Sequence, residues 1–362
     1  MNKHKLFRFF RTVHAWGGAV LALLLLVVSV SGSILVWKNE FVKMALVETD
    51  ATFDATPQSL ADIATGVEAQ FSANDIYQIQ FPTSDFPLTK VTLADDKYAY
   101  LDTSGHIVAQ WVLNERWEEW LFDLHHRLLL GNTGLVIAGF AGMTMILLLF
   151  AGIIAFWPLR RGWRHGFWPQ NAARSNLQAA HRNIGIVEAL PFLLTLVTGV
   201  ILAFPEQSLK LLLEPFRGEA YSLDFAENLD TITGADSGDW LPAMERALAT
   251  FPGAHIRTAQ VPSDNSPYRI MGLQQPGSLH PTGQSKVYIE SSEGWMDIRI
   301  DDQAQHITER LYNFAYPLHT GRFDNFFYKV LLSISGMLVA VLSTLGLLSF
   351  IKQFRGSAAK IS

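Results

Sequence analysis

Four histidines recur at matched positions beside long apolar stretches, and imidazole is a side chain well suited to bind a metal ion. His14 and His181 each begin such a stretch and are followed by glycine at +4 and at +18. His125 and His319 begin two others and are followed by glycine at +17 and at +27. Because glycine fills about 7% of positions in ordinary proteins, these matched spacings indicate an internal duplication rather than coincidence.

The absence of cysteine narrows the kinds of redox centre that the chain could hold. None of its 362 residues is cysteine, which excludes disulfides, thiolate-bound iron–sulfur clusters and covalently attached c-type haem. The 11 histidines are the obvious alternative ligands. The net charge of −5 gives no reason to expect nucleic acid as a partner.

Four stretches reach the roughly 20 apolar residues that a helix needs to cross a bilayer. We place these transmembrane helices at 13–37, 125–157, 181–205 and 319–351. A cleaved signal peptide is the alternative for the first span, but Trp37-Lys38-Asn39-Glu40 is not a small-residue cleavage site. The sequence therefore predicts an integral membrane α-helical bundle surrounded by membrane lipids.

The distribution of charge predicts the orientation of the chain in the membrane. The segments 1–12, 158–180 and 352–362 contain lysine and arginine but no acidic residue. Nearly all aspartate and glutamate lies in the two long segments 38–124 and 206–318. By the positive-inside rule, the basic segments and both termini are cytoplasmic, and the two acidic segments lie outside.

The two outer segments have the same order of expected elements. An amphipathic helix is expected at 59–71 and again at 240–251, and each is followed by a strand ending in Gln-x-Pro and then by a hairpin with a glycine turn. The predicted fold is a four-helix membrane bundle with two extracytoplasmic α+β domains. Its repeating unit of helix, small domain and helix is used twice, and parallel repeats pack about a pseudo-twofold axis along the membrane normal.

The orientation sorts the four histidines into two levels. His14 and His181 lie at the cytoplasmic end, and His125 and His319 lie at the outer end. Haem iron takes two axial imidazoles, and such sites are built in helix bundles, whereas bare zinc or copper needs three or four ligands. A single histidine near a membrane interface often only bonds locally. Four at matched positions predict two haem b groups, with these histidines as the axial ligands of iron.

Several neighbours of the histidines are candidate haem contacts. Gly18 and Gly185 lie one helical turn beyond two of the ligands and could give the flat porphyrin room. Three arginines beside the ligands could pair with haem propionates or serve only as interface anchors: Arg127, Arg182 and Arg322. His126 competes with His125, but it breaks both glycine spacings, so we assign it to a supporting or substrate-facing position.

At these residues the sequence resembles the PepSY-associated transmembrane family over nearly its whole length. The motifs that carry the resemblance are His14-Ala15-Trp16-Gly17-Gly18, Ala180-His181-Arg182-Asn183-Ile184-Gly185, Asp123-Leu124-His125 with Leu129-Leu130-Gly131, and Pro317-Leu318-His319-Thr320-Gly321. The chain departs from the family pattern at Ala180, where leucine is usual, and at His126, where arginine is usual.

The resemblance implies PepSY-type outer domains and a ferric-siderophore reductase of the bacterial inner membrane, with both outer domains in the periplasm. Such proteins contain two b-type haems, take electrons from the cytoplasmic side and reduce ferric siderophore, releasing Fe(II). The implied partners are the siderophore and a separate electron donor, which would be a cytoplasmic reductase, a flavin or a quinone. No general base or nucleophile is arranged in the sequence, so catalysis would rest on the haems alone.

Two other functions are compatible with the same sequence. The chain could be an electron conduit that serves another periplasmic acceptor. It could also be a non-enzymatic membrane protein whose outer domains bind a peptide or inhibit a peptidase, in which case it would contain no haem.

Overall fold

The computed structural model describes most of the chain, and its residues form two compact units. The described ranges are 3–46, 53–158, 166–213, 239–264, 268–290, 296–301, 307–322 and 325–358. One unit, here called the helical unit, comprises Met1–Trp37, Trp120–Ser208 and Leu318–Ser362. The other, the sheet unit, comprises Lys38–Glu119 and Leu209–Pro317. Each is described by itself.

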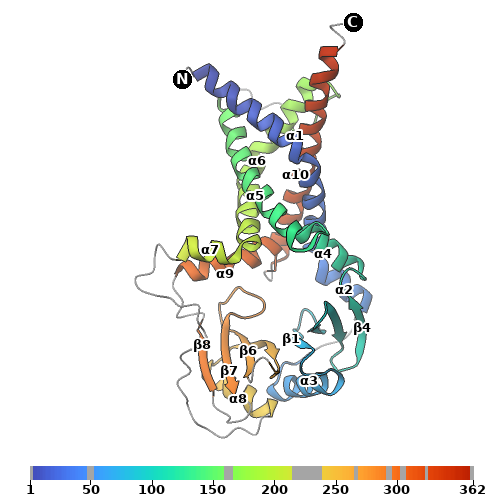
Figure 1. The fold of residues 1–362 in the computed structure, drawn as a ribbon, viewed down its shortest axis with the longest axis vertical. Helices are drawn as coiled ribbons and strands as arrows, with labels where there is room; N and C mark the ends of the chain where they lie inside the picture. The colour runs from blue at the N-terminus through green and yellow to red at the C-terminus, as the bar shows by residue number, and fades with distance from the viewer. Residues whose placement is uncertain are drawn as a thin grey trace. The chain divides into compact units, whose positions relative to one another are not determined.

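The helical unit is built on four helices that are long and apolar enough to cross a membrane. They are α1 (Lys3–Leu35), α5 (Gly131–Phe156), α6 (Arg174–Ala203) and α10 (Phe326–Ala358). Figure 1 shows these four helices as a bundle. Helices α1 and α6 each pack against both α5 and α10, so α1 lies diagonally across from α6, and α5 from α10. Large apolar side chains such as Val20 and Leu147 are exposed on the bundle surface, where lipid tails are as apolar as they are. The chain is therefore a membrane protein, as its sequence predicted.

His125 and His319 lie on short helices that precede the long ones. These helices are α4 (Trp117–Arg127), which carries His125, and α9 (Ile307–Thr320), which carries His319. After α4, Leu128 and Leu129 have φ of 53° and 59°, and after α9, Gly321 has φ of 69°. A residue in the left-handed region ends a helix because it breaks the hydrogen-bond ladder.

The continuous helices expected at 125–157 and 319–351 are therefore wrong. The sequence Leu128-Leu129-Leu130 contains no residue that usually ends a helix. In the structure, however, Leu128 and Leu129 adopt the left-handed conformation. The turn is tight enough that a Cβ at Gly134 would collide with the carbonyl oxygen of Arg127. Each outer histidine is thus carried by a helix separate from the one that spans the membrane.

Two further short helices are α2 (Lys38–Leu46) and α7 (Pro205–Leu213). The sheet unit contains one antiparallel sheet of eight strands in the order β4-β3-β2-β1-β5-β6-β7-β8. Its first half is β1 (Ile76–Gln80), β2 (Thr89–Leu93), β3 (Lys97–Leu101) and β4 (Ile107–Val112). Its second half is β5 (His255–Gln260), β6 (Tyr268–Gln274), β7 (Ser285–Glu290) and β8 (Met296–Ile300). The halves join where β1 pairs with β5, with Ile79 opposite Ala259. The two outer segments, expected as separate domains, therefore share one sheet.

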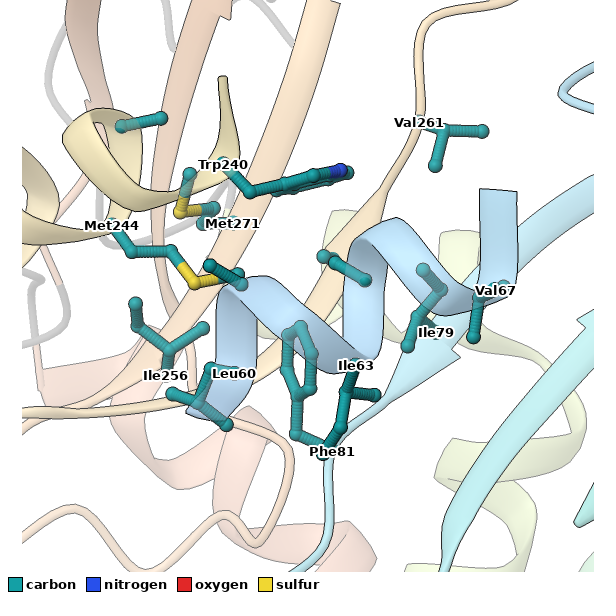
Figure 2. Close-up of a cluster of buried hydrophobic side chains, with 14 of the residues drawn as sticks. Leu60, Ile63, Val67, Ile79, Phe81, Trp240, Met244, Ile256, Val261 and Met271 are labelled. Carbon is teal, nitrogen blue, oxygen red and sulfur yellow. The ribbon is translucent and has the colours of Figure 1, made fainter. Parts of the chain in front are cut away.

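Helices α3 (Pro57–Gln70) and α8 (Trp240–Thr250) pack on each other and supply much of the core of this unit (Figure 2). Thr56 caps α3 by accepting a hydrogen bond from the Ser59 amide, and Pro57 fits the first helical turn. Leu60 of α3 and Met244 of α8 are fully buried with apolar residues of the strands. Burying each such side chain contributes about 1.5–3 kcal/mol, so the two α+β halves have one shared core.

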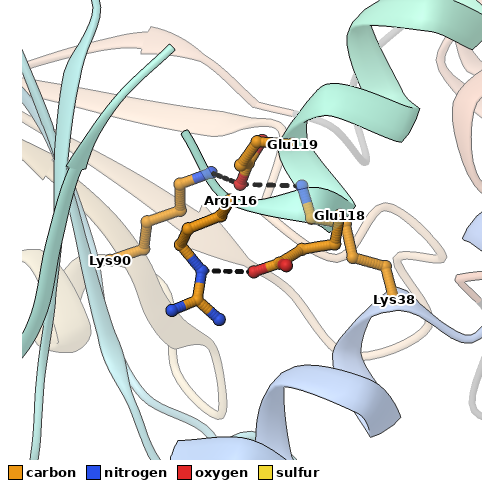
Figure 3. A network of polar contacts seen from close by, with 5 residues as sticks. All are labelled: Lys38, Lys90, Arg116, Glu118 and Glu119. Carbon is orange, nitrogen blue, oxygen red and sulfur yellow. Dashed lines mark hydrogen bonds and ion pairs between the residues drawn. The ribbon is translucent and has the colours of Figure 1, made fainter. Parts of the chain in front are cut away.

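An ion-pair network ties the start of α4 to α2 and β2 (Figure 3). The buried carboxylate of Glu119 lies 2.8 Å from Lys38 Nζ and 3.4 Å from Lys90 Nζ. Beside it, the Arg116 guanidinium pairs with Glu118. Burial raises the pKa of Glu119, but the ammonium groups of Lys90 and Lys38 outweigh that effect and hold the pKa below its ordinary value.

Replacing Glu119 with glutamine should destabilise the protein in a pH-dependent way. Because the folded-state pKa is lowered, the carboxylate stabilises the fold above the ordinary glutamate pKa of 4.5, and this contribution is lost as pH falls through the folded-state value. We expect a loss of about 1–3 kcal/mol at pH 7, because the lysines lose their charged partner, and the difference in stability from the original protein should disappear in acid. Thermal unfolding of the purified protein between pH 3 and 8 would measure both.

The matched control is Asp95→Asn, which removes an exposed pair with Lys97 at 3.8 Å. Such surface pairs contribute little, so this variant should unfold like the original at every pH. Equal behaviour of the two variants would show that the Glu119 network does not stabilise the fold.

Candidate functional site

The structure brings the four predicted histidines together as two pairs inside the helical unit. The rings of His14 on α1 and His181 on α6 have centroids 5.9 Å apart, with an interplanar angle of 65°. The rings of His125 on α4 and His319 on α9 have centroids 6.1 Å apart, with an angle of 46°. These are the pairs that the repeat predicted, and each draws one ring from either half of the chain.

Every one of the four rings is held by a hydrogen bond to a backbone carbonyl of a neighbouring helix. The Nδ1 distances are 2.8 Å for His14 to Leu148 O, 2.9 Å for His181 to Leu342 O, 2.9 Å for His125 to Val28 O and 3.2 Å for His319 to Thr195 O. A carbonyl can only accept, so Nδ1 donates its proton. In a neutral imidazole this leaves Nε2 with the lone pair that can bind a metal.

The matched glycines explain how the rings reach these carbonyls. A Cβ at the glycine would lie 2.7 Å from His125 Cε1 for Gly32, 2.8 Å from His14 Cε1 for Gly152, 3.0 Å from His319 Cε1 for Gly199 and 3.2 Å from His181 Cε1 for Gly346. In each case the accepting carbonyl belongs to the residue four positions earlier, which shares its helix face. Because glycine has no Cβ, the imidazole ring can reach the carbonyl. We call the four residues that allow this contact the window glycines: Gly32, Gly152, Gly199 and Gly346.

This role of the glycines at +18 and +27 was not deduced from the sequence, although their regular spacing was the available signal. The glycines at +4 behave differently. A Cβ at Gly18 would meet no atom within 4 Å, and one at Gly185 would meet only Leu342 Cδ2, at 3.7 Å. A Cβ would therefore fit at either position without a collision.

His125 and His319 have hydroxyl partners that the sequence analysis missed. Ser31 Oγ lies 3.2 Å from His125 Nδ1, and Thr198 Oγ1 lies 3.1 Å from His319 Nδ1. Both hydroxyls also donate to carbonyls of their own helices. Each precedes a window glycine, whereas the inner windows are preceded by Ala151 and Leu345. The two levels therefore offer their histidines different surroundings.

The remaining predicted residues lie in varied environments. The Nδ1 atom of His126 and the Nε atom of Arg127 are buried and, among the described residues, have no hydrogen-bond partner. Arg182 Nε donates to Asn183 Oδ1 at 3.2 Å, and Arg322 is partly buried. Two orphaned polar atoms beside His125 are the kind that a bound anionic group could satisfy.

The histidine pairs differ from a site for a bare metal ion. Within the part of the chain that the structure describes, no three His, Cys, Asp or Glu side chains gather as a metal site would need. Two-ligand sites suit a metal whose other positions are filled by a cofactor. The donor set therefore fits haem better than it fits zinc or copper.

Together, the fold and the paired histidines define a class of protein: a four-helix membrane protein with a large α+β unit. The family model described as the PepSY-associated TM region matches residues 11–353. The chain thus belongs to this family, as its motifs indicated. The comparison with curated proteins gave no match.

Alanine at the window glycines should destabilise the protein in the order of the clearances. Gly32→Ala is expected to be the most harmful and Gly346→Ala the mildest, because overpacking forces the imidazole off its carbonyl at a cost of about 1–3 kcal/mol. Thermal unfolding of the purified protein in detergent would rank the four variants. As a control, Gly66→Ala on α3 meets no atom within 4 Å and should be neutral or stabilising by up to about 1 kcal/mol. A ranking unrelated to clearance would contradict the window role.

Proposed function

We propose that this protein is an inner-membrane dihaem b reductase that passes electrons from a cytoplasmic donor to ferric siderophore in the periplasm. The observation that carries the proposal is the pair of facing imidazoles at each of two levels, with centroids 5.9 Å and 6.1 Å apart. Two metal–nitrogen bonds of about 2 Å each, plus the distance from each nitrogen to its ring centre, require a separation of about 6 Å. One iron would fit between the rings of either pair.

The hydrogen bonds of the histidines support the same proposal. Histidines that bind metals usually donate their other ring N–H to a carbonyl or carboxylate, which fixes the tautomer and raises ligand basicity. All four rings have such a bond through Nδ1. His125 and His319 share theirs with a hydroxyl oxygen. The chain would hold each ring so that only Nε2 faces the iron.

Other residues would fill supporting roles in this proposal. The open space at Gly18 and Gly185 would admit the porphyrin. Arg127, with its orphaned Nε, would pair with a propionate. Arg182 and Arg322 are the corresponding candidates beside His181 and His319. The surrounding apolar helices would exclude water from the iron.

When bound, the two haems would supply one-electron Fe(III)/Fe(II) chemistry at both faces of the membrane. The proposed orientation places His14 and His181 near the cytoplasm, and His125 and His319 near the periplasm, in accord with the basic segments. The ferric chelate gains one electron to become Fe(II), which hard oxygen ligands hold less tightly, so the metal is released. The donor would be a separate reductase, a flavin or a quinone.

An internal duplication is part of the proposal. The carbonyl-and-window arrangement occurs at His14 and at its counterpart His181, and again at His125 and His319. The sheet also has four strands from each half, joined at its centre. Both observations support a repeated unit arranged about a pseudo-twofold axis.

Removal of single histidines should remove haem one level at a time. The purified protein is expected to show a Soret band and a reduced-minus-oxidised spectrum of bis-histidine haem b. His14→Ala or His181→Ala should lose about half of the haem, and His125→Ala or His319→Ala the other half, because each iron loses an axial ligand. Haem content per protein would be measured by absorbance.

Two control variants make this test specific. His126→Ala tests whether His125, rather than its neighbour, is the outer ligand. His255→Ala changes an exposed strand residue away from both pairs. Both variants should retain two haems. A colourless original protein would instead favour the peptide-binding or peptidase-inhibiting function.

The substrate requires a separate experiment. Adding a ferric hydroxamate siderophore to the reduced protein, after excess reductant is removed, should reoxidise it and yield Fe(II) that a ferrous chelator traps. If the ferric siderophore does not reoxidise the reduced haem, the result would indicate an electron conduit for another periplasmic acceptor.

A further inference from the structure

Within the described parts of the four membrane-spanning helices, one acidic side chain is buried away from the helix ends. Glu188 of α6 is 5% exposed, and the hydroxyl of Ser335 on α10 donates a hydrogen bond of 2.7 Å to its Oε2. Carboxyl groups at this depth are costly in a membrane and are usually functional. The sequence analysis passed over this residue, although it is an acid within one of the predicted spans.

Glu188 lies between the two levels of histidines. It follows His181 by seven residues and precedes Thr195, whose carbonyl accepts the His319 Nδ1 proton, by seven residues. Seven residues are about two helical turns and about 10.5 Å of helix, so the three residues lie near one stripe of α6. This stripe is the one that carries the histidine contacts of both levels.

The repeat has no equivalent acid in its first half. The spacing that relates His14 to His181 relates Leu21 to Glu188, and the spacing that relates His125 to His319 relates Ala141 to Ser335. Both members of the hydrogen-bonded pair are therefore apolar in the other half. The hydrogen-bonded carboxyl therefore occurs in the second half of the chain and not at the equivalent position of the first half.

The helices packed against α6 supply no other ionisable group at this depth. Between its ends at Gly131 and Phe156, α5 contains no titratable side chain, and α10 contains none between Lys329 and Lys352. Across the bundle, α1 has none after His14. The four histidines keep their Nδ1 protons on carbonyls. Among the described residues of α1, α5, α6 and α10 that lie between the two histidine pairs, Glu188 is the remaining group that can gain or lose a proton. The buried Asp123, and His126 with its buried Nδ1 atom, lie on α4 beside His125.

We propose that Glu188 is a redox-linked proton site, an inference that rests on the proposed function. If haem is bound as proposed, Glu188 would take up one proton from water, its carboxylate becoming the acid, for the one electron that the donor supplies to a haem. When the electron passes to the ferric chelate, the proton is released. Coulomb's law over about 10 Å at an effective dielectric of about 20 changes the proton affinity by roughly tenfold to twentyfold.

The test is a spectroelectrochemical titration of the full-length, haem-loaded protein in detergent at several values of pH. We expect the midpoint potential of at least one haem to fall as pH rises, by about 60 mV in total, which is the one-electron equivalent of a tenfold change. Glu188→Gln should remove this dependence while both haems are retained. Glu188→Leu, which restores the residue of the first half, should do the same.

Two serine variants test whether the pH dependence of the potential comes from the carboxyl group or from a general change in packing. Ser335→Ala removes the donor to the carboxylate and should move the pH-dependent change to higher pH. Ser343→Ala, whose buried hydroxyl bonds only to Val339 O of its own helix among the described contacts, should leave the titration unchanged.

The outcomes that overturn the proposal are distinct. A potential independent of pH in the original protein, or the same dependence in Glu188→Gln, removes Glu188 as the proton site and leaves the haem assignment standing. A preparation without a Soret band overturns both the haem assignment and this inference.

Discussion

The structure of the helical unit depends on contact between an imidazole ring and the backbone of another helix. Such contact needs a carbonyl that a side chain can approach, and in a helix every carbonyl is flanked by the Cβ of the residue four positions later. Glycine at that position removes the obstacle. Four windows of this kind, at Gly32, Gly152, Gly199 and Gly346, fix four rings and so fix how the helices pack. In this arrangement each histidine also gains a hydrogen bond that satisfies its ring N–H.

The same constraint explains the diagonal pairing of the helices. Each ring that is anchored to an adjacent helix lies beside a ring from the other half of the chain. His14 is anchored to α5 but faces His181 of α6, and His181 is anchored to α10. For this pair, neighbouring helices position the imidazoles and diagonal helices carry them. For the other pair, His125 of α4 is anchored to α1, and His319 of α9 is anchored to α6. Between the two histidine pairs, the Glu188 carboxyl is buried against Ser335 of α10.

Much of the helical unit could be predicted from the sequence, because histidine and glycine recur at matched spacings in its two halves. The membrane helices follow from apolar length, and the histidine pairs follow from the matched glycine spacings. The break after His125 could not be foreseen, since Leu128-Leu129-Leu130 favours helix and only the tertiary fold places two of these leucines in the left-handed region. The single sheet could not be predicted either. Its two halves join through pairing of β1 with β5, which are about 180 residues apart in the sequence, and local sequence patterns do not indicate such distant contacts.

The register at the centre of the sheet has a consequence of its own. Ile79 faces Ala259, and these residues occupy equivalent places before the two Gln-x-Pro motifs. A strand that meets its own counterpart in this way forms an isologous contact, the kind that joins identical subunits in twofold dimers. Each histidine pair likewise takes one member from either half. A chain of half this length could complete neither pair within itself and would present an unpaired strand, so two copies, or one fused gene, are the smallest assembly in which every ring has its partner.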